Sequence, residues 1–224
     1  MSTKSCPENA THLQGASDPP RKDEARTVVI FDGDDTLWRT EELYDTARSA
    51  ARALAAGAGF DGDEWERLQR RFDLENVVTL GYSAERFPTS CRQAYEELCR
   101  ASAARHDPTL GSKIVAAART AFANDPALMP HASATLSLLQ QRGLALGLLT
   151  KGDVAVQKQR VERCGLQQYF NEIRIVADKK PQHILELVRT LGGKPDSAWM
   201  VGNSLRSDIL PALEAGLRAL WIDA

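Results

Sequence analysis

The stretch Thr27–Trp38, which reads TVVIFDGDDTLW, decides the fold of this 224-residue chain. Its second to fifth residues, VVIF, are all apolar and mostly β-branched. A continuous apolar run of this length is typical of a strand covered on both faces, as in a parallel sheet flanked by helices. Asp32, Asp34 and Asp35 follow directly. Carboxylates this close together repel one another unless a cation compensates them, so the end of this strand is the first candidate site.

Beyond residue 126 the chain alternates between helical and strand patterns. Strands are expected at 144–149, 173–176, 198–201 and 219–222, and the helices between them end at or near glycines. Strands joined by helices of this length predict right-handed crossovers and a parallel sheet. The expected fold class is therefore α/β, with a Rossmann-like doubly wound parallel sheet as its core.

Residues 39–125 have a helical pattern throughout and are too many for a loop between two strands. We therefore predict an inserted α-helical cap domain at 39–125, and a core made of 27–38 and 126–224. Residues 1–26 contain four basic and four acidic side chains and no apolar run, a composition that predicts a flexible leader. Within the insertion, a helical face that carries two cysteines is expected to pack in the interior.

Overall composition excludes several classes of partner. The 28 basic and 30 acidic residues leave a net charge of −2, which does not favour nucleic acid or an anionic membrane as a partner. The four cysteines lack the paired spacing of a zinc site and are too sparse for a disulfide scaffold. No apolar stretch is long enough for a signal peptide or a membrane span. We expect a cytoplasmic protein, either a monomer or a homodimer.

The strand end Asp32-Gly33-Asp34-Asp35-Thr36 resembles the first motif of the haloacid dehalogenase-like (HAD) superfamily, an apolar strand followed by Asp-any-Asp-any-Thr. The resemblance implies that Asp32 is a nucleophile that becomes an aspartyl phosphate. It implies that Asp34 is first a general acid and then a base, and that Thr36 holds the turn at the substrate. A carboxylate can attack a phosphoryl group only if the negative charge between them is neutralised, which calls for a metal ion and a cationic side chain.

The strand expected at 144–149 leads into Thr150-Lys151-Gly152-Asp153. A hydroxyl at a strand end, followed by a glycine turn and a helix N-terminus, is well suited to hydrogen-bond a phosphate. Thr150 matches the second motif of the superfamily, which implies a phosphate-binding role for Thr150 and for the neighbouring Lys151 and Gly152. A simple helix N-cap is an alternative interpretation of Asp153.

Two further strand ends complete the predicted site. Asp178-Lys179-Lys180-Pro181 offers an ammonium group, and the resemblance favours Lys179 over Lys180 as the lysine that faces nucleophile and phosphate. Asn203 stands where the superfamily usually has Asp, in the run Gly202-Asn203-Ser204-Leu205-Arg206-Ser207-Asp208. An amide oxygen can still bind Mg²⁺, which accepts few protein oxygens and several waters. The predicted Mg²⁺ ligands are Asp32, Asp34, Asn203 and Asp208.

Asp34 separates the activities found in the superfamily. Related dehalogenases and phosphonatases lack an acid at this position, so the resemblance implies a phosphatase. A phosphosugar mutase and a non-catalytic member that binds a phosphorylated ligand remain alternatives. A cap that closes over the site disfavours a folded protein substrate, so a small-molecule phosphate ester is expected. Tyr82 and Arg86 in the cap are candidates for contacts with the leaving group, although ordinary packing is the simpler interpretation of both.

Overall fold

The computed structural model describes residues 26–223. The leader predicted at 1–26 lies outside this range apart from Arg26, as does Cys6. Five parallel strands form one sheet in the order β3-β2-β1-β4-β5. Their bounds are β1 Val28–Phe31, β2 Ala145–Lys151, β3 Glu172–Val176, β4 Ala198–Gly202 and β5 Arg218–Trp221. The predicted parallel α/β fold class is confirmed.

Strand β1 lies at the centre of the sheet, and all four of its residues are buried there. Phe31 at its end pairs with Leu148 of β2 on one side and with Val201 of β4 on the other. Parallel strands bring their carboxyl ends to one edge of the sheet. The polar residues that follow β1, β2 and β4 therefore meet at the point where the strand order diverges, which is where open α/β sheets bind ligands.

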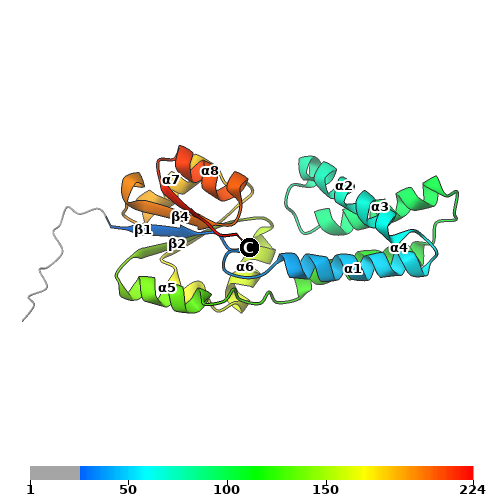
Figure 1. Ribbon diagram of the computed structural model, residues 1–224, viewed down its shortest axis with the longest axis horizontal. Helices are drawn as coiled ribbons and strands as arrows, with labels where there is room; N and C mark the ends of the chain where they lie inside the picture. Colours follow the sequence, from blue (N-terminus) through cyan, green and yellow to red (C-terminus); the bar gives the residue numbers. More distant parts are fainter. Residues whose placement is uncertain (1–25, 224) are drawn as a thin grey trace, which may run out of the picture.

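Helices cover both faces of the sheet (Figure 1). Ile30 and Leu149 pack with helices α7 and α8, whereas Phe31 and Leu148 point to the opposite face and pack with α5 and α6. The helices that flank the sheet are α5 Ala132–Gln141, α6 Val154–Arg163, α7 Pro181–Thr190 and α8 Leu210–Glu214. Short turns of other helix types are η1 Gln167–Tyr169, η2 Pro195–Ser197 and the π-helical η3 Leu205–Ile209.

Four helices between β1 and α5 pack around an apolar core of their own, apart from the two cores that flank the sheet. They lie beyond one end of the sheet (Figure 1). These helices are α1 Glu41–Gly57, α2 Gly62–Leu80, α3 Arg86–Ala101 and α4 Pro108–Ala123. Cys91 and Cys99 of α3 are both buried in this core, which confirms that their helical face is an interior one. Burial also raises the pKa of the Cys91 thiol.

Two of the inserted helices begin after an aspartate N-cap. Asp107 caps α4 by accepting a hydrogen bond from the backbone N–H of Thr109 at 2.8 Å. For α2, the sequence predicts a capping box made by Asp63 with Glu66, and this prediction is wrong. The N-cap is Asp61, whose carboxylate accepts from the backbone N–H groups of Asp63 and Glu64, because the helix already begins at Gly62. Throughout residues 26–223, each helix is too short or too polar to cross a bilayer.

Candidate active site

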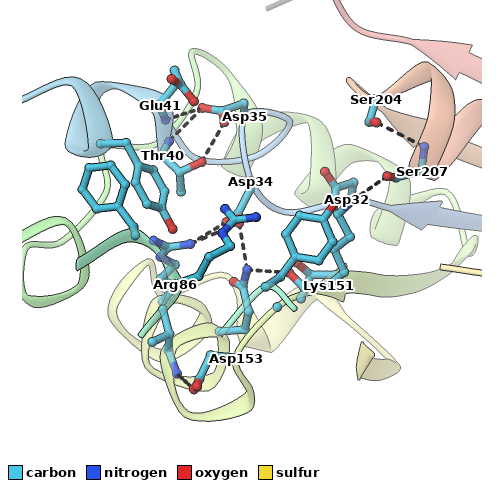
Figure 2. A pocket seen from close by; sticks show the side chains of 18 of the residues that line it. Asp32, Asp34, Asp35, Thr40, Glu41, Arg86, Lys151, Asp153, Ser204 and Ser207 are labelled. Carbon is cyan, nitrogen blue, oxygen red and sulfur yellow. Dashed lines mark hydrogen bonds and ion pairs between the residues drawn. The ribbon is translucent and has the colours of Figure 1, made fainter. Parts of the chain in front are cut away.

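A cleft of about 330 Å³ opens at the carboxyl edge of the sheet, between the strand ends and helices α1 to α4. All the residues predicted for the site line this cleft except Thr36. Figure 2 shows residues from the sheet side, such as Asp32, Lys151 and Ser207, in the same pocket as Glu41 and Arg86 of the helices. Segments far apart in the sequence are thus brought around one cavity of small-molecule size.

Lys179 joins two carboxylates at the floor of the cleft. Its Nζ donates to Asp32 Oδ1 and, at 2.6 Å, to Asp208 Oδ1. The three residues are 4%, 6% and 0% exposed, respectively. Lys180, by contrast, is exposed and precedes α7 as its N-cap residue. Of the two candidate lysines, the structure therefore brings Lys179 to the cleft.

This cluster is short of positive charge, because two buried carboxylates share one ammonium group. Burial opposes the charge on Lys179, but Asp32 and Asp208 outweigh it, so the pKa of Lys179 is raised. Burial also raises the pKa of Asp32, and its contact with Lys179 only partly offsets that rise, to which Asp208 and Asp34 add. A further cation beside Asp32 would relieve this deficit.

The turn after β4 holds Asp208 in place. Asp208 Oδ2 accepts from the backbone N–H of Ser204 at 2.9 Å, across the π-helical turn η3. A Cβ at Gly202 would overlap the Asp208 carboxylate, so β4 must end in a glycine here. Trp221 of β5 donates its indole N–H to the carbonyl oxygen of Asn203 at 2.8 Å and fixes the loop. Asn203 itself lines the cleft.

The end of β2 offers groups suited to a phosphate. The Thr150 hydroxyl is buried and has no hydrogen-bond partner within the described part of the chain. Lys151 Nζ donates to Ser207 Oγ at 2.6 Å. Gly152 has a φ of 137°, a conformation that glycine adopts readily. Asp153 caps α6, because its carboxylate accepts hydrogen bonds from the backbone N–H groups of Ala155 and Val156. A buried hydroxyl without a partner is costly, so a ligand oxygen at this point would stabilise it.

Asp34 and Asp35 face different groups from Asp32. The Asp34 carboxylate accepts from Trp38 Nε1 at 2.7 Å, Gln157 Nε2 at 2.8 Å and Arg160 Nη1 at 3.1 and 3.2 Å. Sequence reasoning missed Gln157 and Arg160. The signal available was their spacing of three on the helix that follows the second motif, which puts both on one helical face.

Asp35 is structural. Its carboxylate accepts from the Thr40 backbone N–H at 2.8 Å, from Thr40 Oγ1 at 2.7 Å and from the Glu41 N–H at 3.1 Å, and so fixes the start of α1 (Figure 2). Thr36 donates to Asp32 Oδ2 at 3.5 Å but does not line the cleft. It therefore reaches a ligand only through Asp32.

The two residues predicted from the helical insertion do line the cleft. Arg86 forms an ion pair with Asp73 at 3.3 Å, and its guanidinium lies 4.9 Å from the centre of the Tyr82 ring. Lys151 Nζ lies 4.1 Å from the centre of the same ring. Tyr82 thus lies close to one cation from the helical insertion and to one cation from the end of β2.

The predicted metal ligands are only partly brought together. Within residues 26–223, no three His, Cys, Asp or Glu side chains form a group that could hold a metal ion. Lys179 lies between Asp32 and Asp208, and the Asp34 carboxylate is held by Arg160. Asp32 and Asn203 line the same cleft, and a carboxylate and an amide together with water match the oxygen donors that Mg²⁺ prefers. The charge deficit at Asp32 also fits a divalent cation.

A family model for haloacid dehalogenase-like hydrolases matches residues 27–216. The chain belongs to this family. The HAD-like hydrolase is 31% identical over 198 residues to a glyceraldehyde 3-phosphate phosphatase of Methanopyrus kandleri, a match that covers 85% of this chain and 81% of that protein. It is 29% identical over 209 residues to a ribulose-1,5-bisphosphate 5-phosphatase of Halopiger xanaduensis, covering 88% of this chain and 84% of the relative.

A solved structure agrees with these matches. The HAD-like hydrolase superposes on a haloacid dehalogenase-like family hydrolase from Xanthomonas campestris with a TM-score of 0.76 and 28% identity. The match covers 91% of this chain and 84% of that one. The superfamily that the first motif predicted is therefore confirmed.

Proposed function

We propose that this HAD-like hydrolase is a magnesium-dependent phosphatase that cleaves a small phosphate monoester through an aspartyl phosphate on Asp32. One observation carries the proposal: the unpartnered, buried Thr150 hydroxyl lines the same cleft as Asp32 and its partner Lys179. A phosphoryl group bound there would receive a hydrogen bond from Thr150 and charge compensation from Lys179. The nucleophile and the groups that stabilise the transition state would then act on one phosphorus atom.

In the first step, the Asp32 oxygen that Lys179 does not hold attacks the phosphorus, and the bond between phosphorus and the ester oxygen breaks. The electron pair of that bond goes to the ester oxygen, which takes a proton from Asp34 and leaves as an alcohol. Lys179 keeps Asp32 in place and reduces its repulsion from the phosphoryl oxygens. Its raised pKa keeps it in the charged form that this role requires.

In the second step, a water molecule attacks the phosphorus of the aspartyl phosphate while Asp34 accepts a proton from the water. The bond between phosphorus and the Asp32 oxygen breaks, which releases inorganic phosphate and restores the Asp32 carboxylate. The proton from the water thus replaces the one that Asp34 gave to the alcohol in the first step.

When bound, Mg²⁺ supplies positive charge to the oxygens of the phosphoryl group. Asp32 and Asn203 would hold it, and Asp34 and Asp208 line the same cleft. Because Asn203 is neutral, the site contains one carboxylate fewer than it would with Asp at this position. Lys151, whose ammonium group donates to Ser207 at 2.6 Å, is positioned at the cleft to contribute charge to the phosphate end.

Residues 39–125 would act as a cap over this site and select the substrate. Tyr44, Phe87 and Phe122 of the cap line the cleft together with Tyr82 and Arg86. The names of the two relatives, which refer to glyceraldehyde 3-phosphate and ribulose 1,5-bisphosphate, support a small phosphate ester as the substrate. The size of the cleft supports the same class, because about 330 Å³ suits a metabolite.

The test is release of phosphate from p-nitrophenyl phosphate and a panel of phosphorylated metabolites, with Mg²⁺ and with a chelator. We expect turnover that needs Mg²⁺ and falls by at least about 10³-fold in Asp32→Asn. Asp178→Asn is the matched control, since this exposed carboxylate lies one residue from Lys179 but outside the cleft. Absence of turnover across the panel, or full activity in Asp32→Asn, would contradict the proposal.

A further inference from the structure

We propose that Gln157 and Arg160 of α6 are positioning residues that orient the Asp34 carboxylate for proton transfer to the leaving oxygen. The inference rests on the proposed function, in which Asp34 protonates the ester oxygen. Neither Gln157 nor Arg160 contacts the phosphoryl group in the proposed hydrolysis. Both line the cleft, three residues apart on one face of the helix that follows the phosphate-binding turn.

The two side chains approach Asp34 from one element. Gln157 Nε2 donates to Asp34 Oδ2 at 2.8 Å. Arg160 Nη1 lies 3.2 Å from Oδ1 and 3.1 Å from Oδ2, so it donates to both oxygens. Trp38 Nε1 adds a third donor at 2.7 Å from Oδ1. Contacts to both oxygens from groups in different positions fix the plane of the carboxylate, and not only its place.

The donors are themselves buried. Gln157 is 2% exposed and Arg160 is 5% exposed, and the Trp38 side chain is fully buried. Gln157 Nε2 also donates to the carbonyl oxygen of Lys151 at 3.0 Å, which connects it to the end of β2. Side chains locked by packing can hold a reacting group within the narrow range of positions that catalysis requires.

The chemistry of the donors suits a positioning role. Indole, amide and guanidinium groups donate hydrogen bonds and do not exchange protons with a carboxylate at neutral pH. None of them competes with the substrate for the proton that Asp34 transfers. The Asp34 side chain keeps 30% of its surface exposed, on the side of the cleft, so one part of it remains open to a ligand.

If the ion pair between Arg160 and Asp34 were purely structural, we would expect a different result. Loss of a structural contact would slow the reaction of all substrates by the same factor. Loss of a contact that orients the general acid affects poor leaving groups most, because p-nitrophenolate is a weak base that leaves without protonation, whereas an alkoxide does not. The ratio of kcat/KM for an alkyl phosphate to kcat/KM for p-nitrophenyl phosphate therefore separates the two roles.

The experiment measures this ratio, with glycerol 3-phosphate as the alkyl ester, for wild type, Arg160→Met, Arg160→Lys and Gln157→Leu. We expect Arg160→Met and Gln157→Leu to lower the ratio about tenfold, within the range of general acid catalysis. Arg160→Lys restores the positive charge and should recover part of the ratio. Arg163→Met is the matched control, because Arg163 lies one turn along α6, pairs with Asp125 at 2.5 Å and does not line the cleft.

Asp34→Asn provides the reference for the double variant Asp34→Asn/Arg160→Met. We expect this double variant to hydrolyse the alkyl ester no more slowly than Asp34→Asn alone, because Arg160 acts through Asp34. An unchanged ratio in Gln157→Leu and in the Arg160 variants would overturn the inference, and so would the same loss in Arg163→Met. If Arg160→Met does not fold, Arg160→Lys and Gln157→Leu decide the question. A wild type without turnover of either ester would instead defeat the proposed function itself.

Discussion

Asp32 and Asp34 lie two residues apart in sequence but belong to two ionic clusters with different balances of charge. At Asp32, two buried carboxylates share the single ammonium group of Lys179. At Asp34, one carboxylate accepts from an indole, an amide and a guanidinium group. The first cluster has two carboxylates for one ammonium group, whereas in the second one carboxylate faces one guanidinium group. Acids two residues apart in one motif therefore differ in environment because of the side chains that contact them.

The largest effect is expected from removing the shared cation. Lys179→Met would leave Asp32 and Asp208 buried without a cationic partner, so we expect the free energy of unfolding to fall by about 3–5 kcal/mol and turnover to be lost. Denaturant unfolding at neutral pH and phosphate release measure both. Lys180→Met is the control, because Lys180 is exposed, and we expect a change below about 0.5 kcal/mol. Equal effects of the two substitutions would contradict the assignment of Lys179.

A smaller effect is expected when the first cluster is displaced but its charges are kept. In Gly202→Ala the added Cβ would overlap the Asp208 carboxylate, so we expect a loss of about 1–3 kcal/mol in stability together with reduced turnover. Gly57→Ala is the control, since a Cβ there meets no atom within 4 Å. If thermal unfolding and turnover of Gly202→Ala match those of the wild type, Asp208 is not held as described.

A third substitution adds negative charge to the Asp32 cluster, which already has two carboxylates for one ammonium group. Asn203→Asp should lower the stability of the metal-free protein and tighten Mg²⁺ binding by about tenfold, or about 1.4 kcal/mol. Isothermal titration gives the affinity, and unfolding with a chelator gives the stability of the metal-free form. The same Mg²⁺ affinity in both proteins would mean that Asn203 does not face the metal.

The smallest effect is expected at the third acid of the motif. Asp35 fixes the start of α1 through the Thr40 and Glu41 N–H groups, so Asp35→Ala should cost about 1 kcal/mol, as for the loss of a helix cap. We expect this loss in thermal unfolding without a change in the ratio of alkyl to aryl ester hydrolysis. A changed ratio would assign Asp35 to the chemistry.

Which parts of the fold and the site can be predicted from the sequence depends on how far apart in the chain the contacting residues lie. The strand ends were predictable because an apolar run followed by Asp32 or Thr150 is a local pattern. Gln157 and Arg160 were missed because their contacts with Asp34 span 123 and 126 residues, and no local rule connects them. The choice between Lys179 and Lys180 needed tertiary structure as well, since burial at the floor of the cleft is what distinguishes them.

The N-cap of α2 shows a different limit of prediction from sequence, which is the exact residue at which a helix begins. Asp61 and Asp63 are both acceptable caps by sequence, and Gly62 between them gives no preference for either. The structure selects Asp61, because α2 begins at Gly62. The difference of one or two residues has no effect on the site, which depends on where the strands end.

The phosphatase mechanism is tested most directly by identifying the residue that carries the phosphoryl group. Asp34→Asn should still be phosphorylated by p-nitrophenyl phosphate, because that leaving group needs no acid, but should lose its phosphoryl group slowly without the base. Acid quenching followed by peptide mass spectrometry should then find one phosphoryl group on Asp32, and none when Asp32→Asn is also present. A phosphoryl group on another residue, or none at all while p-nitrophenol is released, would contradict the account.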